Sequence, residues 1–330
     1  MIFRPLQIQA EDHRLKPVPL EDIMMPTDQL AHTYSIVARD PDTGQLGVAV
    51  QSHYFSVGSV VTWAEAGVGA VATQSLSDPA YGKLGLDMMR AGKNAPDTLA
   101  GLVASDSMQA VRQVAMVDAQ GQVAAHTGQF AISEAGHITG DGFSAQANMM
   151  LKNTVWPAMS EAYRGAKGEL VDRFLAALDA AEAEGGDIRG RQSAAILIVE
   201  AKSTGRPWID TTFDLRVDDA AEPLVEIRRL VAIRRAYIHM RLGNDAAQRI
   251  DLETTEREFT AAERLIGDNP EMRYWHGIAL LQLGKIDDGL AILKEVGRRD
   301  RKWIELTLRL PVLLFAGDAS LKDRITKLLE

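Results

Sequence analysis

Polar residues that can take part in catalysis occur at the ends of several apolar, β-branched segments in the first third of the chain. Thr33 and Ser35 lie in the first segment, His53 ends the second, and Glu65 lies near the end of the third. A hydroxyl can attack a carbonyl carbon if a nearby group accepts its proton. Histidine, or a carboxylate of raised pKa, can do so near neutral pH. We therefore predict that Thr33, Ser35, His53 and Glu65 are catalytic.

Side-chain amides and carboxylates farther along the chain could bind a substrate. The amides of Gln74, Asn148 and Gln192 could donate hydrogen bonds to a developing oxyanion. We assign substrate binding to Gln74, Asp78, Asn148, Asp187 and Gln192.

Several of these residues also have a structural interpretation. Thr33 and Ser35 could simply form hydrogen bonds at a strand edge. Glu65 could pair with Arg39 or another cation. Asp187, which follows two glycines, could form a charge-assisted bond with Arg189 and so tie a helix end to a strand.

Other familiar site motifs are absent or lack their structural context. Residues 67–72 match a Gly-x-Gly-x-x-Ala dinucleotide fingerprint, but no helix pattern follows them, and we expect no nucleotide site there. The seven histidines show no metal-binding spacing, and the chain has no cysteine. The acidic residues Asp214, Asp218 and Asp219 are expected to be a solvated strand end. We therefore predict no metal and no cofactor.

Composition limits the partners. The chain has 330 residues, a hydrophobic content of 46% and a formal net charge of −9, which disfavours a nucleic-acid-binding module. No stretch approaches the ~20 apolar residues of a membrane span, and the N-terminus lacks the pattern of a signal peptide. We expect no membrane association and a cytoplasmic location, with a small-molecule substrate as the partner.

The residues predicted to be catalytic need a sheet to position them. β-Branched runs between turn residues predict strands, and apolar residues at helical spacing predict helices. The expected strands are 33–40, 46–53, 60–67, 68–75, 111–118, 122–126, 143–148, 193–199 and 212–217, and the expected helices are 81–92, a segment from 95, 153–163 and 168–184. Strands and helices in separate runs predict an α+β sandwich.

The chain changes character after residue 219, where helical periodicity replaces the strand pattern. Segments 272–283 and 286–296 predict a helical hairpin with a turn at Gly284 and close helix contact at Gly277. Further turns are expected at 243–245 and 317–318. The hairpin resembles a tetratricopeptide repeat, although Arg273 and Arg301 replace the usual Trp and Pro. Such helical pairs form docking surfaces, so a protein partner could bind this tail.

A basic group near the start of the tail has an expected role of its own. In an acidic chain, we expect Arg228, Arg229, Arg234 and Arg235 to form a salt-bridge face between domains or subunits.

Motifs within residues 33–40, 56–59, 66–74, 185–195 and 214–219 resemble a bacterial and archaeal family, the domain of unknown function number 1028. The resemblance covers about residues 33–235. It implies a four-layer αββα sandwich of the N-terminal-nucleophile hydrolase type, in which the first residue of the first strand attacks an amide carbon. We accordingly divide the chain into an N-terminal extended arm (1–32), the sandwich (33–222) and a helical domain (223–330).

Two features of this chain depart from the family pattern. Ala147 stands where the family commonly has glycine between Gln146 and Asn148, which could narrow a backbone approach. In many members the threonine follows the initiator methionine, whereas 32 residues precede Thr33 here. We therefore expect Thr33 to lack a free α-amine.

Two functions remain open from the sequence. The first is a hydrolase of a non-peptide carbon–nitrogen bond, in a small amide, cyclic amide or imine. Thr33 or Ser35 would attack, or would position a water, and His53 and Glu65 would transfer protons. The second is a catalytically silent domain that binds a small ligand or a protein, with the helical tail as its docking module. In either case we expect a homodimer.

Overall fold

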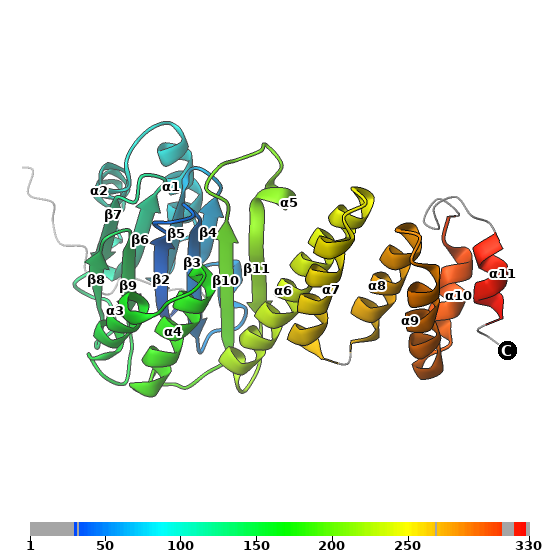
Figure 1. Ribbon diagram of the computed structural model, residues 1–330. Helices are drawn as coiled ribbons and strands as arrows, with labels where there is room; N and C mark the ends of the chain where they lie inside the picture. The colour runs from blue at the N-terminus through cyan, green and yellow to red at the C-terminus, as the bar shows by residue number, and fades with distance from the viewer. Residues whose placement is uncertain (1–29, 32, 268, 312–319, 328–330) are drawn as a thin grey trace, which may run out of the picture.

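The computed structural model describes residues 30–31, 33–267, 269–311 and 320–327 of the chain. Two antiparallel sheets pack face to face in its first two thirds (Figure 1). One sheet has the strand order β11-β10-β3-β2-β9-β8. Its strands are β2 (Thr33–Arg39), β3 (Leu46–Ser52), β8 (Gly136–Gly140), β9 (Phe143–Ala147), β10 (Ser193–Val199) and β11 (Thr211–Val217).

The other sheet has the order β1-β5-β6-β7, with β4 also paired to β5. Its strands are β1 (Leu30–Ala31), β4 (Thr62–Glu65), β5 (Gly69–Leu76), β6 (Arg112–Asp118) and β7 (Val123–Thr127). Short helical segments lie in the connections, at Val57–Ser59, Gln109–Val111 and α5 (Pro207–Asp210).

Helices cover the outer face of each sheet. The pair α1 (Ala80–Arg90) and α2 (Ala95–Ser105) packs on β5 and β6, and the pair α3 (Val155–Gly165) and α4 (Leu170–Ala183) packs on β2 and β9. The predicted α+β class and four-layer αββα sandwich are confirmed. The chain forms this sandwich because its central strands β2, β3, β5 and β6 are buried on both faces, so each sheet needs cover on both sides.

Strand β2 shows how the layers are divided. Tyr34, Ile36 and Ala38 face α3 and α4, whereas Val37 belongs to the apolar layer between the sheets. Side chains alternate along a strand, so Thr33 and Ser35 share the face of Val37. Both hydroxyls therefore point between the two sheets.

Six helices follow the sandwich in the described residues (Figure 1). They are α6 (Pro223–Gln248), α7 (Leu252–Ile266), α8 (Pro270–Gln282), α9 (Ile286–Arg299), α10 (Lys302–Arg309) and α11 (Ser320–Thr326). The predicted hairpin corresponds to α8 and α9, and Gly284 has the positive φ of 75° that such a turn needs. The turn expected at 317–318 lies outside the described residues.

The prediction of a turn at 243–245 is wrong, because α6 continues through these residues to Gln248. Gly243 has a packing role instead. A Cβ at Gly243 would lie 2.7 Å from the ring of Phe259, so the glycine lets α7 approach α6. A glycine inside a helix is thus a close-contact site here rather than a stop signal.

Helix α6 joins the tail to the sandwich. Its Leu224, Ile227 and Val231 are buried in the same cluster as the outer face of β10 and β11. Arg234 donates from Nε to the carbonyl of Thr212 at 2.7 Å, which covers part of the exposed edge of β11.

Ion pairs reinforce this junction. Arg235 pairs with Asp172 at 2.6 Å, and Arg228 pairs with Asp179 at 2.5 Å, both on α4. Arg229 instead pairs with Glu226 of its own helix. The predicted basic group is therefore largely a face between the tail and the sandwich.

None of the helices in the described part of the chain has both the length and the apolar character needed to cross a membrane.

Candidate functional site

Thr33 lies where the chain crosses from one sheet to the other. Ala31 in β1 pairs with Ser75 of β5, and two residues later Thr33 opens β2 in the opposite sheet, directly across from Ser52 of β3. The Thr33 hydroxyl donates to the carbonyl of Ala31 at 2.8 Å and lies 3.2 Å from Ser52 Oγ. Two hydroxyls thus meet at the end of the inner layer.

The carbonyl of Thr33 is held by three donors. The Asn148 backbone N–H donates at 3.1 Å, the Asn148 Nδ2 at 3.4 Å and the Gln74 Nε2 at 3.1 Å. A carbonyl usually accepts one or two hydrogen bonds. The backbone of Thr33 is therefore fixed from both sheets, since Gln74 belongs to β5 and Asn148 follows β9.

Ser35 joins the same layer one step farther along β2. Its hydroxyl donates to Gln74 Oε1 at 2.6 Å and accepts from Gln146 Nε2 at 2.6 Å. Gln146 Oε1 in turn accepts from Ser144 at 2.9 Å. Because the proton and a lone pair of Ser35 are both engaged, this hydroxyl orients its neighbours and is poorly placed to attack a substrate.

Gln113 of β6 is the hub of the layer. Its Oε1 accepts from Gln74 Nε2 at 2.7 Å and from Asn148 Nδ2 at 3.0 Å. Its Nε2 lies 2.9 Å from both Thr127 Oγ1 and the carbonyl of Ala147, and 3.2 Å from the Gly136 carbonyl. One side chain therefore links the two sheets and orients both amides that hold Thr33.

We call this group the Thr33 cluster. Its members are all fully buried, and they are Thr33, Ser35, Ser52, Gln74, Gln113, Gln146 and Asn148. Burying so many polar groups is costly unless each is hydrogen-bonded, and a fully satisfied network specifies one arrangement of its members. The cluster is thus a rigid polar layer inside an otherwise apolar interior.

A histidine borders the cluster. His137 Nδ1 lies 2.8 Å from Thr127 Oγ1, which contacts Gln113. Burial, with a smaller contribution from His126, lowers the pKa of His137, so its imidazole is biased toward the neutral form. In the described residues, no group of three or more His, Asp or Glu side chains is arranged to hold a metal ion.

His53 does not join the Thr33 cluster. Ser52, the last residue of β3, pairs with Thr33, and His53 lies in the bend that follows the strand. The backbone N–H of His53 donates to Asp187, and its Nδ1 lies 3.3 Å from the carbonyl of Arg191. The geometry therefore does not support the predicted role of His53 as a base for Thr33.

Glu65 lies at the far end of the sandwich. It pairs with Gly69 at the start of β5, whereas Gln74 is near the end of that strand. Arg90 of α1 forms an ion pair with Glu65, with Nε 2.7 Å from Oε1. The expected pairing of Glu65 with a cation is found, to Arg90 rather than Arg39. Thr33, His53 and Glu65, which the sequence analysis assigned to catalysis, therefore have separate sets of contacts and do not meet.

Asp78 also has structural contacts. Its Oδ1 accepts from the Ala80 backbone N–H at 2.9 Å, at the start of α1, and its Oδ2 lies 3.7 Å from Arg112.

Asp187 and Gln192 are held in the loop before β10. The fully buried carboxylate of Asp187 accepts from Arg189 Nη2 at 2.7 Å and from the His53 backbone N–H at 3.2 Å. The predicted structural bond between Asp187 and Arg189 is therefore present. Gln192 donates to Asp219 at 3.2 Å, away from the cluster.

Backbone strain accumulates at the Thr33 end of the sandwich. Five non-glycine residues in the described chain have a positive φ, and four of them lie in strands or loops at this end: Ser56 (55°), Ser75 (72°), Glu134 (53°) and Met149 (58°). Ser75 directly follows Gln74, and Met149 directly follows Asn148. Such conformations cost about 1–3 kcal/mol each and occur preferentially at functional sites.

The sequence predicted four of the cluster residues, namely Thr33, Ser35, Gln74 and Asn148, and missed Gln113 as well as the roles of Ser52 and Gln146. A glutamine within an apolar strand such as 112–118 is the signal that would have identified Gln113, because a buried amide needs several partners.

Comparisons with known proteins agree with this fold. The model of a family of unknown function (DUF1028) matches residues 33–227. A crystal structure of a DUF1028 protein from Silicibacter pomeroyi is 32% identical to this chain, with a TM-score of 0.55, and the match covers 61% of this chain and 88% of that one. The search of curated proteins found no match. The family resemblance noted in the sequence is thus confirmed.

Proposed function

This chain belongs to the DUF1028 family of unknown function, and for this member we propose a hydrolase that acts on a non-peptide carbon–nitrogen bond. The observation that carries the proposal is the Thr33 cluster. Hydroxyl and amide side chains from both sheets fix Thr33, the first residue of β2. Two cluster residues, Gln74 and Asn148, are each followed directly by a residue with a strained backbone. Rigid positioning of a hydroxyl is what nucleophilic catalysis requires.

A full-length chain lacks a proton acceptor beside the Thr33 hydroxyl among its described residues. Among the described residues, no carboxylate or imidazole lies within hydrogen-bond distance of Thr33 Oγ1, which contacts the Ala31 carbonyl and Ser52. An α-amine on Thr33 would supply the missing base. We therefore propose that activity requires a chain end at Thr33, which would also remove the Ala31 carbonyl.

The reaction then follows from these groups. Thr33 Oγ1 bonds to the amide carbon of the substrate while its proton passes to the α-amine. The carbon–nitrogen bond breaks, and the leaving nitrogen takes that proton. A water molecule, deprotonated by the same amine, hydrolyses the resulting ester and regenerates the hydroxyl. Gln74 and Asn148 hold the Thr33 backbone during both steps.

One observation favours a catalytically silent domain instead. Every member of the Thr33 cluster is fully buried, and its hydrogen bonds are made within the protein. A buried polar network can serve only to specify packing.

The test uses a full-length variant with a site-specific protease sequence placed directly before Thr33. After cleavage, with the new end verified by mass, the protein is incubated with a panel of small linear and cyclic amides and imines. We expect turnover of at least one compound, about 100-fold or more above the cleaved Thr33→Ala protein, and none before cleavage. A folded, cleaved protein without turnover would support the silent domain.

A further inference from the structure

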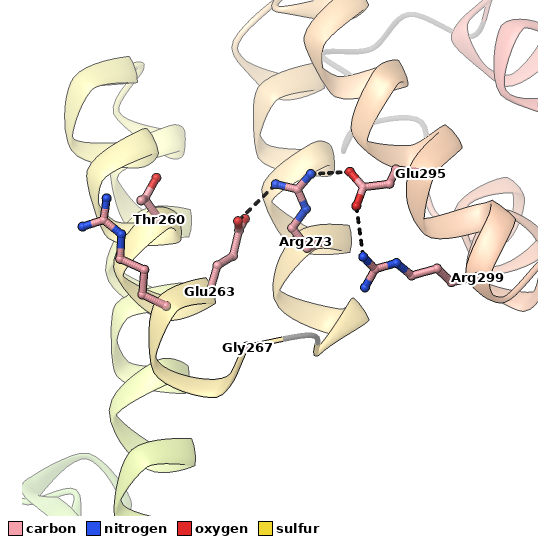
Figure 2. Close-up of a pocket in the computed structure, with 7 residues that line it drawn as sticks. Thr260, Glu263, Gly267, Arg273, Glu295 and Arg299 are labelled. Carbon is pink, nitrogen blue, oxygen red and sulfur yellow. Dashed lines mark hydrogen bonds and ion pairs between the residues drawn. The ribbon is translucent and has the colours of Figure 1, made fainter.

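A charged hollow lies in the helical tail, far along the chain from the Thr33 cluster. It has a volume of about 380 Å³ and lies between α7, α8 and α9. Figure 2 shows the residues that line it, which are Thr260, Glu263, Arg264, Gly267, Arg273, Glu295 and Arg299. Three guanidinium groups and two carboxylates thus surround one cavity.

Arg273 is held at the centre of this hollow. Its Nη1 lies 3.1 Å from Glu263 Oε2, and its other Nη atom pairs with Glu295 (Figure 2). Glu263 also contacts His276 Nδ1 at 2.8 Å, and that ring stacks on Phe259 with the centroids 4.9 Å apart. The guanidinium of Arg273 is therefore fixed in direction before any ligand arrives.

The other two arginines lie at the surface of the hollow. Arg299 approaches Glu295 at 3.4 Å. Arg264 is exposed, and no ion pair to it is found among the described residues. With three arginines and two glutamates, the lining carries a net positive charge in a protein whose net charge is −9. This local excess of guanidinium suits an anionic ligand.

We infer that this hollow binds an acidic peptide segment of a partner protein through its carboxylates. A guanidinium fork matches a carboxylate bidentately. A peptide fits better than a nucleic acid because Glu263 and Glu295 would repel a ligand with a charge at every backbone unit. Stacked helical pairs present this kind of extended surface.

Removal of a positive lining residue and removal of a negative one should change the affinity for an acidic peptide in opposite directions. Arg264→Gln and Arg299→Gln each remove an attractive group and should weaken binding of an acidic peptide several-fold. Glu295→Gln removes a competing carboxylate, while Glu263 still holds Arg273, and should strengthen binding of the acidic peptide. A purely structural role of these residues would not produce effects of opposite sign.

The experiment is fluorescence anisotropy with the full-length protein and a labelled eight-residue peptide of alternating Glu and Ser. The comparison probe has Gln in place of Glu, and binding to it should be at least about tenfold weaker. Arg309→Gln is the matched control, because Arg309 is an exposed arginine of α10 outside the hollow. That variant should bind like the unmodified protein.

Three outcomes would overturn the inference. The first is no binding, or equal binding of the Glu and Gln peptides. The second is affinity that is unchanged in Arg264→Gln and Arg299→Gln. The third is tighter binding of a single-stranded DNA of matched charge than of the acidic peptide, which would assign the hollow to nucleic acid.

Discussion

Thr33 is fixed more firmly through its carbonyl than through its hydroxyl. Three donors from Gln74 and Asn148 converge on the carbonyl, whereas the hydroxyl donates to the carbonyl of Ala31. Loss of the Ala31 contact would leave Ser52 as the partner of the hydroxyl, while the bonds to the carbonyl would still hold the residue in place. The arrangement suits a nucleophile that becomes available when the chain begins at Thr33.

At the residue scale, Gln113 should be the most sensitive polar position. Gln113→Ala removes the acceptor that the buried amides of Gln74 and Asn148 share, so that only the Thr33 carbonyl still accepts from them, and it should lower the free energy of unfolding by about 2–4 kcal/mol. Urea unfolding followed by tryptophan fluorescence measures this. Gln120→Ala, at an exposed position in the turn after the same strand, is the control and should change it by less than about 0.5 kcal/mol. Equal effects would contradict the hub role.

Side-chain parity explains which site residues could be predicted. Thr33, Ser35 and Gln74 were identifiable because strand ends rich in hydroxyls and amides are unusual in an apolar sheet. His53 lies directly after the last residue of β3, and its contacts are to Asp187 and Arg191 rather than to Thr33. The correct register of β2 against β3 is needed to see that Ser52 is the partner of Thr33.

At the element scale, small residues decide how closely α8 and α9 approach. A Cβ at Gly289 would lie 2.8 Å from the carbonyl of Gly277, so the two helices are in backbone contact there. The sequence predicted this close contact from Gly277. It did not predict that Gly243 likewise allows α6 and α7 to approach closely. Glycine in a helical pattern also signals a helix end, and the sequence analysis placed a turn there.

Gly289→Ala should therefore destabilise the tail although alanine favours helices. The backbone must shift to admit the methyl group, at a cost of about 1–3 kcal/mol. The control is Gly165→Ala at the end of α3, where a Cβ would meet nothing within 4 Å. Helix propensity should make that change neutral or slightly stabilising. Thermal unfolding followed by circular dichroism compares them, and a stabilising Gly289→Ala would refute close backbone contact.

Strand β8 was missed although a signal was present. Its residues Gly136–Gly140 contain two strand formers, Ile138 and Thr139, between two glycines that disfavour strands, but Asp141 and Gly142 follow them directly. An Asp-Gly pair is a strong hairpin signal, and Gly142 has the positive φ of 69° that such turns require. The pairing with β9, rather than local propensity, makes this segment a strand.

At the scale of the whole molecule, α6 makes the sandwich and the tail depend on each other. Ile227 is fully buried against the outer face of the sheet, while Val225 on the same helix is 66% exposed. Ile227→Ala should lower the free energy of unfolding by about 2–4 kcal/mol, and Val225→Ala should have little effect. Urea titration monitored by far-ultraviolet circular dichroism tests both. Equal effects would mean that α6 does not stabilise the sandwich.

The central claim concerns the hydroxyl of Thr33, and mass spectrometry tests it most directly. The protein with a protease sequence before Thr33 is cleaved there and treated with an activated acyl ester. Its intact mass is measured, and peptide mapping then locates the adduct. We predict one acyl group bound to the Thr33 oxygen as an ester that hydroxylamine removes, and no hydroxylamine-labile adduct in the cleaved Thr33→Ala protein, whose α-amine can form only a stable amide. An absent ester adduct, or a hydroxylamine-labile adduct of equal yield in Thr33→Ala, would contradict a nucleophilic role for Thr33.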